Sequence, residues 1–403
     1  MFKKIIKSYD YTLLIAICML CFFGLVMVYS SSMVFAASHP KINNPEFFYD
    51  RQKLSMIIGF LGLLAAMIFP YKAYASSKLL SLIVFGSIGM LLLVAAFGAT
   101  ANNAQSWLKL GTRGIQPSEF TKLSVIIYLA AVYAKKQSYI NDLNRAVLPP
   151  ILFTVGICVF VAIQPDIGTA FIISLIAGTI IVCSGMGIKN IIKLLFFALT
   201  LVGILTPLIL LKRESIFTTE RISRFQGYLD PFLHQGDAGY QLINSYVAMG
   251  SGGITGLGLG QSIQKFGYLP EAHTDFIMAV IAEELGLFGV LFVIFLLAFI
   301  IFKGLLLARK CTDPFGSLLA IGISSMLAIQ TFINLGGLTG LIPITGVTLP
   351  FISYGGSSII LLLLCMGILL NVSMFVNYEK NYKKETVPQT VNEPKFKNNR
   401  YSY

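Results

Sequence analysis

Five carboxylate residues at or inside long apolar segments are the groups of this sequence best suited to acid–base chemistry. They are Glu119, Asp166, Asp275, Glu283 and Glu284. An ionised carboxylate in hydrocarbon costs free energy unless it is paired or faces water, and such residues therefore mark working sites. At a membrane surface, a positioned carboxylate can accept a proton from a hydroxyl group of a substrate, so proton abstraction is the chemistry to expect.

Asp275 is the strongest of these candidates. It lies in the stretch PEAHTDF, where Glu271, His273 and Thr274 crowd beside it at the start of an apolar segment. Thr274 or Asp275 could cap the helix that begins here, but one polar residue is enough for capping. A general base must be ionised, positioned and partly desolvated, and a carboxylate at the start of a membrane-embedded helix meets these conditions. We therefore expect Asp275 to be catalytic and His273 to bind substrate.

Glu283 and Glu284 lie deeper in the same segment. At 100° per residue, Glu283 returns to within roughly 80° of Asp275, whereas Glu284 points the opposite way. At least one of them must face other helices or a wet cavity. An interhelical hydrogen bond and a part in catalysis are both open interpretations.

Cationic side chains that could bind an anionic ligand accompany the carboxylates. In QPSEFTKL, Glu119 and Lys122 are three residues apart and can pair on a helix. They are either a local ion pair at a helix start or the lining of an outward cavity, with Lys122 supplying positive charge. Arg221, Arg224 and Lys265 are donors suited to phosphate, although solvated loop charges are the simpler interpretation.

Two further motifs contain turns. QPDIGT, residues 164–169, predicts a tight turn in which Asp166 caps the following helix. GVTLPFISYGGSS, residues 346–358, sets Ser353 and Tyr354 among proline and glycine. Irregular polar backbone at membrane depth is tolerated where it lines a cavity or is buried in protein, so Ser353 and Tyr354 are candidate substrate contacts. No Asp/Glu cluster dictates a metal site; no cofactor is expected with certainty, although a divalent cation could assist.

The elements that must position these residues are membrane helices. The chain is 56% hydrophobic and only 12% charged, with a mean hydropathy of +0.78 and long apolar runs from end to end, which is typical of a polytopic helical membrane protein. The runs are continuous instead of alternating, which excludes a β-barrel. The net charge of +12 is scattered between the runs, so no nucleic-acid partner is expected.

Counting apolar runs predicts an all-α protein with about ten transmembrane helices. The expected spans are residues 12–33, 54–70, 79–98, 118–134, 147–164, 168–186, 190–211, 275–302, 315–337 and 350–376. An even number places both termini on one side. The segments on that side carry about twice as many Lys and Arg residues as the others, so both termini are expected in the cytoplasm.

One loop is much longer than the rest. Residues 212–274 would form a large extracellular loop between helices 7 and 8, and loops of this length are typically functional or disordered. Within it, GYQLINSYVAMG has helical apolar spacing. Residues 1–378 would then form the membrane domain, and residues 379–403 a disordered cytoplasmic tail.

The motifs VMVYSSS, QPSEFTKL, QPDIGT, GYQLINS, GLGLGQSIQKFGYLPEAHTDFI, EELG and GVTLPFISYGGSS occur in the order and spacing of a known family. Over nearly the whole chain the sequence resembles the SEDS family, named for shape, elongation, division and sporulation. Ala272 within PEAHTDF and the stretch TLPFISYGG resemble the FtsW-like cell-division branch of the family, which includes the sporulation relative, more than they resemble the elongation branch. Many members have Arg before the Trp of the loop preceding span 4, whereas this chain has Ser106 before Trp107, so no anion contact is expected there.

The resemblance implies a peptidoglycan glycosyltransferase that polymerises lipid II on the outer face of the bacterial plasma membrane. It implies that the protein works with a cognate class B penicillin-binding protein, which is a transpeptidase, and with other division proteins. It also implies that the protein is enriched at the septum. The essential aspartate of the family corresponds to Asp275, and its outer-cavity Glu/Lys motif to Glu119 and Lys122.

The expected reaction joins the 4-hydroxyl of one lipid-linked disaccharide to the anomeric carbon of another, with inversion and loss of undecaprenyl pyrophosphate. Asp275 would be the general base, and Lys122, Arg221, Arg224 or Lys265 would stabilise the pyrophosphate. Two alternatives stay open. A lipid II flippase or transporter would use Glu283 and Glu284 at mid-depth, and a non-catalytic scaffold of the division machinery would need none of these carboxylates.

Overall fold

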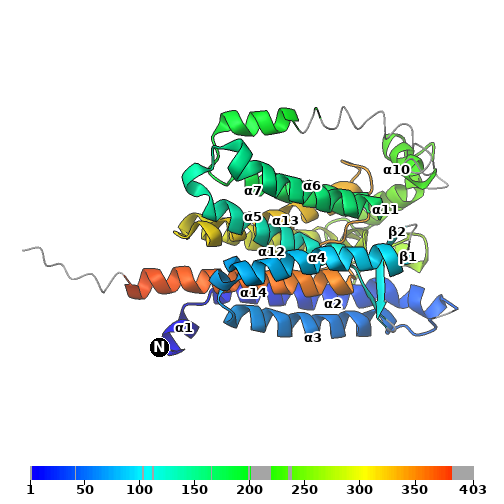
Figure 1. The fold of residues 1–403 in the computed structure, drawn as a ribbon. Helices are drawn as coiled ribbons and strands as arrows, with labels where there is room; N and C mark the ends of the chain where they lie inside the picture. The colour runs from blue at the N-terminus through cyan, green and yellow to red at the C-terminus, as the bar shows by residue number, and fades with distance from the viewer. Residues whose placement is uncertain are drawn as a thin grey trace, which may run out of the picture.

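The computed structural model describes residues 2–40, 42–101, 104–110, 113–164, 166–197, 200, 219–234 and 238–383. Long helices run side by side along one direction (Figure 1). The helices and strands are α1 (Phe2–Lys7), α2 (Tyr11–Ser38), α3 (Phe47–Ile68), η1 (Tyr71–Ala75), α4 (Ser77–Phe97), β1 (Ala99–Ala101), β2 (Ala104–Leu110), β3 (Arg113–Ile115), α5 (Pro117–Lys135), η2 (Gln137–Tyr139), η3 (Leu143–Val147), α6 (Leu148–Ile163), α7 (Ile167–Val182), α10 (Thr219–Leu229), α11 (Ala238–Gly252), η4 (Gln264–Phe266), α12 (Ile277–Lys310), α13 (Pro314–Leu338), α14 (Gly356–Tyr378) and η5 (Glu379–Lys383).

The polytopic, all-helical fold predicted from the apolar runs is confirmed, but the number ten is not. In the described part of the chain, seven helical segments are long and apolar enough to cross a membrane. They are α2, α3, α4, η3 with α6, α12, α13 and α14 with most of η5. Helices α5 and α7 match the fourth and sixth predicted spans, and α7 is apolar but has only 16 residues. Most of the predicted span 190–211 lies outside the described residues.

Helix α14 lies near the centre of the bundle. It packs against α3 along its length, and small residues bring the two backbones together. A Cβ atom on Gly367 would lie 2.5 Å from the carbonyl oxygen of Leu63. At the far end of this contact, the side chain of Asn371 accepts from the backbone N–H of Tyr71 and donates to the carbonyl of Met67. Helix α4, by contrast, has mostly exposed apolar side chains, as expected for a surface that faces lipid.

The two ends of the bundle differ. The helices α10 and α11 and the strands β1 and β2 lie at one end, whereas α1 and the end of α14 lie at the other (Figure 1). The strands form a small antiparallel sheet in the order β1-β2-β3, which the sequence did not lead us to expect. Helix α11 coincides with the predicted helical stretch GYQLINSYVAMG. Residues 384–403, most of the predicted tail, lie outside the described residues.

Candidate active site

Asp275 lies in the last turn of a loop, immediately before α12. The N-cap residue of α12 is Phe276, and no side chain caps the helix there. The hydroxyl group of Thr274 instead donates to the side chain of Glu271, at 2.6 Å. The capping interpretation of Thr274 and Asp275 is therefore wrong, and the carboxylate of Asp275 does not bind the N–H groups at the start of the helix.

The backbone of Asp275 is held by a residue from another helix. Asn334, on α13, donates through its side-chain nitrogen to the carbonyl oxygen of Asp275 at 2.8 Å and to that of Val347 at 2.8 Å. Asp275 is partly buried, and a small pocket between it and Asn334 also includes Gly346. One side-chain amide thus ties the loop of Asp275 to the loop that precedes α14.

Two residues of that second loop hold the backbone next to Asp275. The hydroxyl group of Ser353 donates to the carbonyl oxygen of Thr274 at 2.5 Å, and it accepts from the backbone N–H of Leu349. The backbone N–H of Tyr354 donates to the carbonyl of His273 at 2.9 Å. Ser353 and Tyr354, predicted as substrate contacts, therefore lie beside the predicted base, and they fix the backbone of the two residues before it.

The surroundings of Asp275 raise the pKa of its carboxyl group to about 7. Burial is the largest cause, and the negative charge of Glu271 adds to it. The Arg224 guanidinium group acts in the opposite direction and lowers the pKa. A carboxylate with a pKa near neutrality can both take up and release a proton at physiological pH, as a general base must.

His273 lies in an aromatic cluster beside the same loop. Its ring is stacked with that of Phe35, with centroids 5.7 Å apart, and lies 4.4 Å from that of Phe48 and 5.8 Å from that of Tyr354. Burial lowers the pKa of His273, so the imidazole is held towards its neutral form. The cluster connects the C-terminal end of α2 and the N-terminal end of α3 to the loop of Asp275.

Glu119 and Lys122 form the predicted ion pair at the start of α5. The Lys122 Nζ atom lies 2.7 Å from Glu119 Oε1, and the two side chains are 1% and 11% exposed. Within the described part of the chain, the other carboxylate oxygen of Glu119 is buried without a hydrogen-bond partner. Because an unpaired buried acceptor is costly, this atom is a candidate contact for a bound group.

Asp166 caps α7 as predicted, since its carboxylate accepts from the backbone N–H of Thr169 at 3.1 Å. Its other oxygen accepts from the side chains of Gln116, at 2.9 Å, and Ser118, at 3.2 Å. The backbone N–H of Gln116 in turn donates to the hydroxyl group of Ser357 on α14. The starts of α5, α7 and α14 are thereby joined.

Lys265 does not have the surroundings expected of a ligand-binding cation. Its Nζ atom lies 2.8 Å from Glu284 Oε1, and both side chains are 0% exposed. The predicted contact with a pyrophosphate is therefore replaced by an internal ion pair. Arg224 is exposed on α10, and the side chain of Arg221, on the same helix, is outside the described part of the chain.

Three residues that contribute to this arrangement were not predicted from the sequence. They are Asn334, Ser30 and Gln52. Gln52 is buried on α3, donates to the carbonyl of Ser353 and accepts from the backbone N–H of Gly355, both at 3.2 Å. Buried amide side chains in a membrane helix are a signal that could have pointed to Gln52 and Asn334, but nothing in the sequence indicates their partners.

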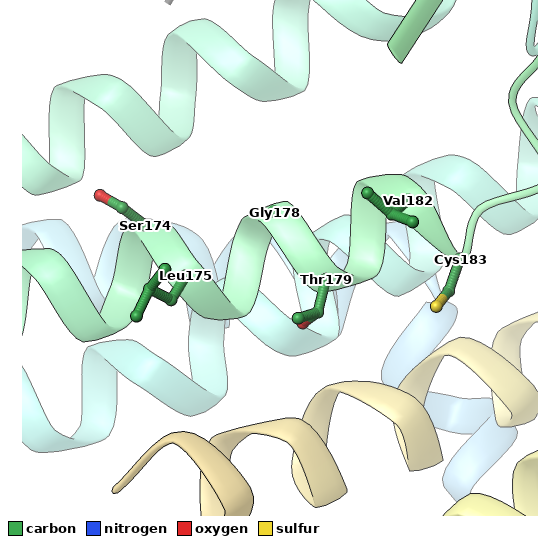
Figure 2. A pocket seen from close by; sticks show the side chains of 6 residues that line it. All are labelled: Ser174, Leu175, Gly178, Thr179, Val182 and Cys183. Carbon is green, nitrogen blue, oxygen red and sulfur yellow. The ribbon is translucent and has the colours of Figure 1, made fainter. Parts of the chain in front are cut away.

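A hollow on the described surface lies away from these residues. It follows one side of α7 and is lined by Ser174, Leu175, Gly178, Thr179, Val182 and Cys183 (Figure 2). Its lining is almost wholly apolar and has no charged group, so it offers nothing for acid–base chemistry. Among the described residues, no group of three His, Cys, Asp or Glu side chains could hold a metal ion.

Comparison with known proteins identifies relatives over almost the full chain. The model of a family described as cell cycle protein, FtsW/RodA/SpoVE, matches residues 11–378. A probable peptidoglycan glycosyltransferase FtsW of Bacillus subtilis (strain 168) is 58% identical over 385 residues, which are 96% of this chain and 95% of that protein. Stage V sporulation protein E of the same strain is 40% identical, over 92% of this chain and 98% of the relative.

Two solved structures have the same fold. A chain from a structure described as "Structural coordination of polymerization and crosslinking by a peptidoglycan synthase complex" superimposes with a TM-score of 0.70 at 25% identity, covering 91% of this chain and 98% of the other. A mutant form of the Thermus thermophilus rod shape determining protein RodA gives a TM-score of 0.62 at 25% identity, covering 91% and 97%. The chain belongs to the FtsW/RodA/SpoVE family of cell cycle proteins.

Proposed function

We propose that this protein is the peptidoglycan glycosyltransferase of cell division that polymerises lipid II at the outer face of the plasma membrane. The observation that carries the proposal is the partly buried carboxyl group of Asp275, with a pKa of about 7, on a backbone held by Asn334 and Ser353. The likeness of the chain to FtsW proteins supports the same reaction.

Asp275 acts as the general base on the acceptor. It takes the proton from the 4-hydroxyl group of one lipid-linked disaccharide as that oxygen attacks the anomeric carbon of a second. The new glycosidic bond forms as the bond to the pyrophosphate breaks, and the anomeric centre changes from α to β. A backbone fixed on both sides keeps the carboxylate within reach of the hydroxyl, and such positioning lowers the barrier.

The leaving group is undecaprenyl pyrophosphate, which departs as a stable anion and needs no acid to protonate it. Lys122 and Arg224 are the cations that we assign to this charge, and Arg221 is a further candidate from α10. Lys122 is enclosed beside the unpaired oxygen of Glu119, whereas Arg224 is exposed and close enough to influence Asp275. His273 and Tyr354 would contact the sugar from the aromatic cluster.

The partner is a class B penicillin-binding protein that crosslinks the new strand, with other division proteins around it. The likeness to a chain of a peptidoglycan synthase complex supports this assignment. The termini would face the cytoplasm and the protein would be enriched at the septum. A transporter has less support, because Glu283 and Glu284, which suggested it, have hydrogen-bond partners inside the protein.

The test is glycan-chain formation from labelled lipid II by the purified full-length protein with its transpeptidase. Asp275→Asn should lower the rate by about 10²–10⁴-fold, because a general base contributes that much. Asp50→Asn, which removes an exposed carboxylate from the first turn of α3, serves as the control and should polymerise at the wild-type rate. An Asp275→Asn protein that is as fast as wild type would remove the basis of the proposal.

A further inference from the structure

Helix α12 is interrupted at Gly286, and a preceding loop fills the interruption. Gly286 has φ 62° and ψ −157°, far from helical values. In a continuous helix, the carbonyl of Glu283 would accept from the N–H of Leu287. Here it accepts from the N–H of Leu257, and the carbonyl of Glu284 accepts from Gly258, both at 2.9 Å.

The helix also donates a hydrogen bond to the loop. The N–H of Leu287 donates back to the loop, to the carbonyl groups of Gly253 and Ile254, at 3.1 Å each. The two backbones approach closely. A Cβ atom on Gly256 would overlap the backbone of the helix, and a Cβ atom on Gly286 would overlap the backbone of the loop. Both glycines also have positive φ, which favours glycine. The loop at 253–258 therefore replaces part of the hydrogen bonding of the helix.

The side chain of Glu283 binds the next part of the loop. Its carboxylate accepts from the hydroxyl group of Ser262 at 2.5 Å and from the backbone N–H groups of Ile263 and Gln264 at 3.0 and 3.3 Å. These donors lie at the start of η4 and in the two residues before it. The carboxylate thus fixes the loop at residues 262–264, before Asp275 along the chain.

Lys265 and Glu284 complete the attachment with a fully buried ion pair. Ser30, on α2, donates to the carboxylate of Glu284 at 2.7 Å, and it accepts from Lys265 Nζ at 3.3 Å. The pair therefore joins three elements, namely α2, η4 and α12. Burying two charges costs free energy that their attraction need not repay, whereas breaking such a pair by removing one partner is strongly destabilising. A buried pair of this kind is better suited to fixing one arrangement than to adding stability.

We propose that Glu283, Glu284 and Lys265 are positioning residues for the transfer reaction, which hold the loop 253–276 in the one arrangement that presents Asp275 to its substrate. The loop is attached at 257–265 to the interruption of α12, and at 273–275 to Ser353, Tyr354 and Asn334. Only residues 266–272 lie between these attachments, so a displacement at the ion pair is transmitted to Asp275. This inference rests on the proposed function.

The reaction is sensitive to such a shift, because a displacement of a catalytic group by about 1 Å can cost about 100-fold in rate. Loosening the loop should lower kcat and leave the KM for lipid II nearly unchanged, since the three residues have no access to a ligand. It should also expose the N–H groups of Leu257 and Gly258 to exchange with solvent. If the three residues served folding alone, the variant molecules that fold would have the wild-type kcat and the wild-type hydrogen exchange in the loop.

The experiment uses the full-length protein with its transpeptidase and measures two quantities. They are the kcat and KM for lipid II polymerisation and the amide hydrogen exchange of peptides within 253–266. The main variant is Lys265→Met/Glu284→Met, which removes both charges and leaves no unpaired charge buried. Ser30→Ala is a milder variant that removes one hydroxyl group and keeps the ion pair.

The control is Lys303→Met, which breaks a second ion pair of α12, with Asp10, near the opposite end of the same helix. We expect the double variant to lose about 100-fold in kcat and to exchange faster in 253–266, with peptides of α14 unchanged. Ser30→Ala should change both quantities in the same direction by less, and Lys303→Met should resemble wild type.

Wild-type kcat together with wild-type exchange in the folded double variant would overturn the inference. Faster exchange with unchanged kcat would also overturn it, because the loop would then be held without effect on Asp275. If the wild-type protein makes no glycan at all, the transferase assignment fails by itself. The exchange rates then still decide whether the ion pair holds the loop.

Discussion

Asn334 and Asp275 are joined by a hydrogen bond of 2.8 Å from the side-chain amide of the first to the backbone carbonyl of the second. The same amide nitrogen donates to Val347, so both of its hydrogens are used. The carboxylate of Asp275 is therefore free for chemistry while its backbone is held from α13. The proposed general base is thus fixed through its backbone carbonyl, an interaction that uses neither oxygen of its carboxylate.

Replacing Asn334 should disturb catalysis more than binding. Asn334→Leu keeps the branched arrangement of side-chain heavy atoms and removes both hydrogen bonds, and we expect kcat to fall by about 10–100-fold with a small change in KM. Steady-state rates on labelled lipid II measure this. Ser325→Ala is the control, since Ser325 is on the same helix and bonds to Thr179 instead. An Asn334→Leu protein with wild-type kcat would show that this contact does not position the base.

Gly286 should tolerate no side chain. Gly286→Ala would set a Cβ atom 2.5 Å from the carbonyl oxygen of Ile254, at a positive φ that alanine rarely adopts. We expect less folded protein, a lower Tm and faster exchange in the loop. Gly89→Ala is the matched control, because Gly89 is inside α4 and a Cβ atom there meets nothing within 4 Å. Equal melting temperatures for the two variants would contradict the interlocked arrangement.

The parts of the site that the sequence predicts are those set by local geometry. Glu119 and Lys122 are three residues apart on a helix, so their pairing follows from helical spacing. The cap at Asp166 depends on a helix that starts beside it. The helical nature of the long apolar runs follows in the same way from their length.

The parts that the sequence does not predict depend on contacts between distant segments. In the sequence, nothing distinguishes Lys265 from the other cations of the loop. Its ion pair with Glu284 forms because the loop enters the interruption of α12. Asn334 is 59 residues from Asp275, and Gln52 is about 300 residues from the loop that it holds. Periodicity determines which face of a helix is polar, but it does not determine which residue of another helix meets it.

Lys122 allows stability and substrate binding to be separated. Lys122→Met leaves the buried carboxylate of Glu119 without its cation, and we expect a loss of roughly 3–5 kcal/mol in the free energy of unfolding. Lys122→Met/Glu119→Gln removes both charges and should recover most of that loss. If Lys122 also binds the pyrophosphate, the double variant should keep a raised KM for lipid II. Thermal unfolding and steady-state kinetics measure the two effects. Recovery of both quantities would limit Lys122 to a structural role.

The two charged neighbours of Asp275 should shift its pH dependence in opposite directions. Asp275 must be deprotonated to act as a base, so the rate should rise with pH through the pKa of about 7. Glu271 raises this pKa and Arg224 lowers it. Glu271→Gln should therefore move the rising limb of the profile to lower pH, and Arg224→Gln should move it to higher pH.

The measurement is kcat for lipid II polymerisation as a function of pH, with Asp50→Asn as a control for general changes in surface charge. The double variant Glu271→Gln/Arg224→Gln should give a limb between those of the two single variants, since the two charges act on the same carboxyl group. The opposite signs make the result diagnostic, because a change in folding or in membrane insertion would affect both single variants alike. A limb that stays in place in both, or moves the same way in both, would mean that a group other than Asp275 controls the profile.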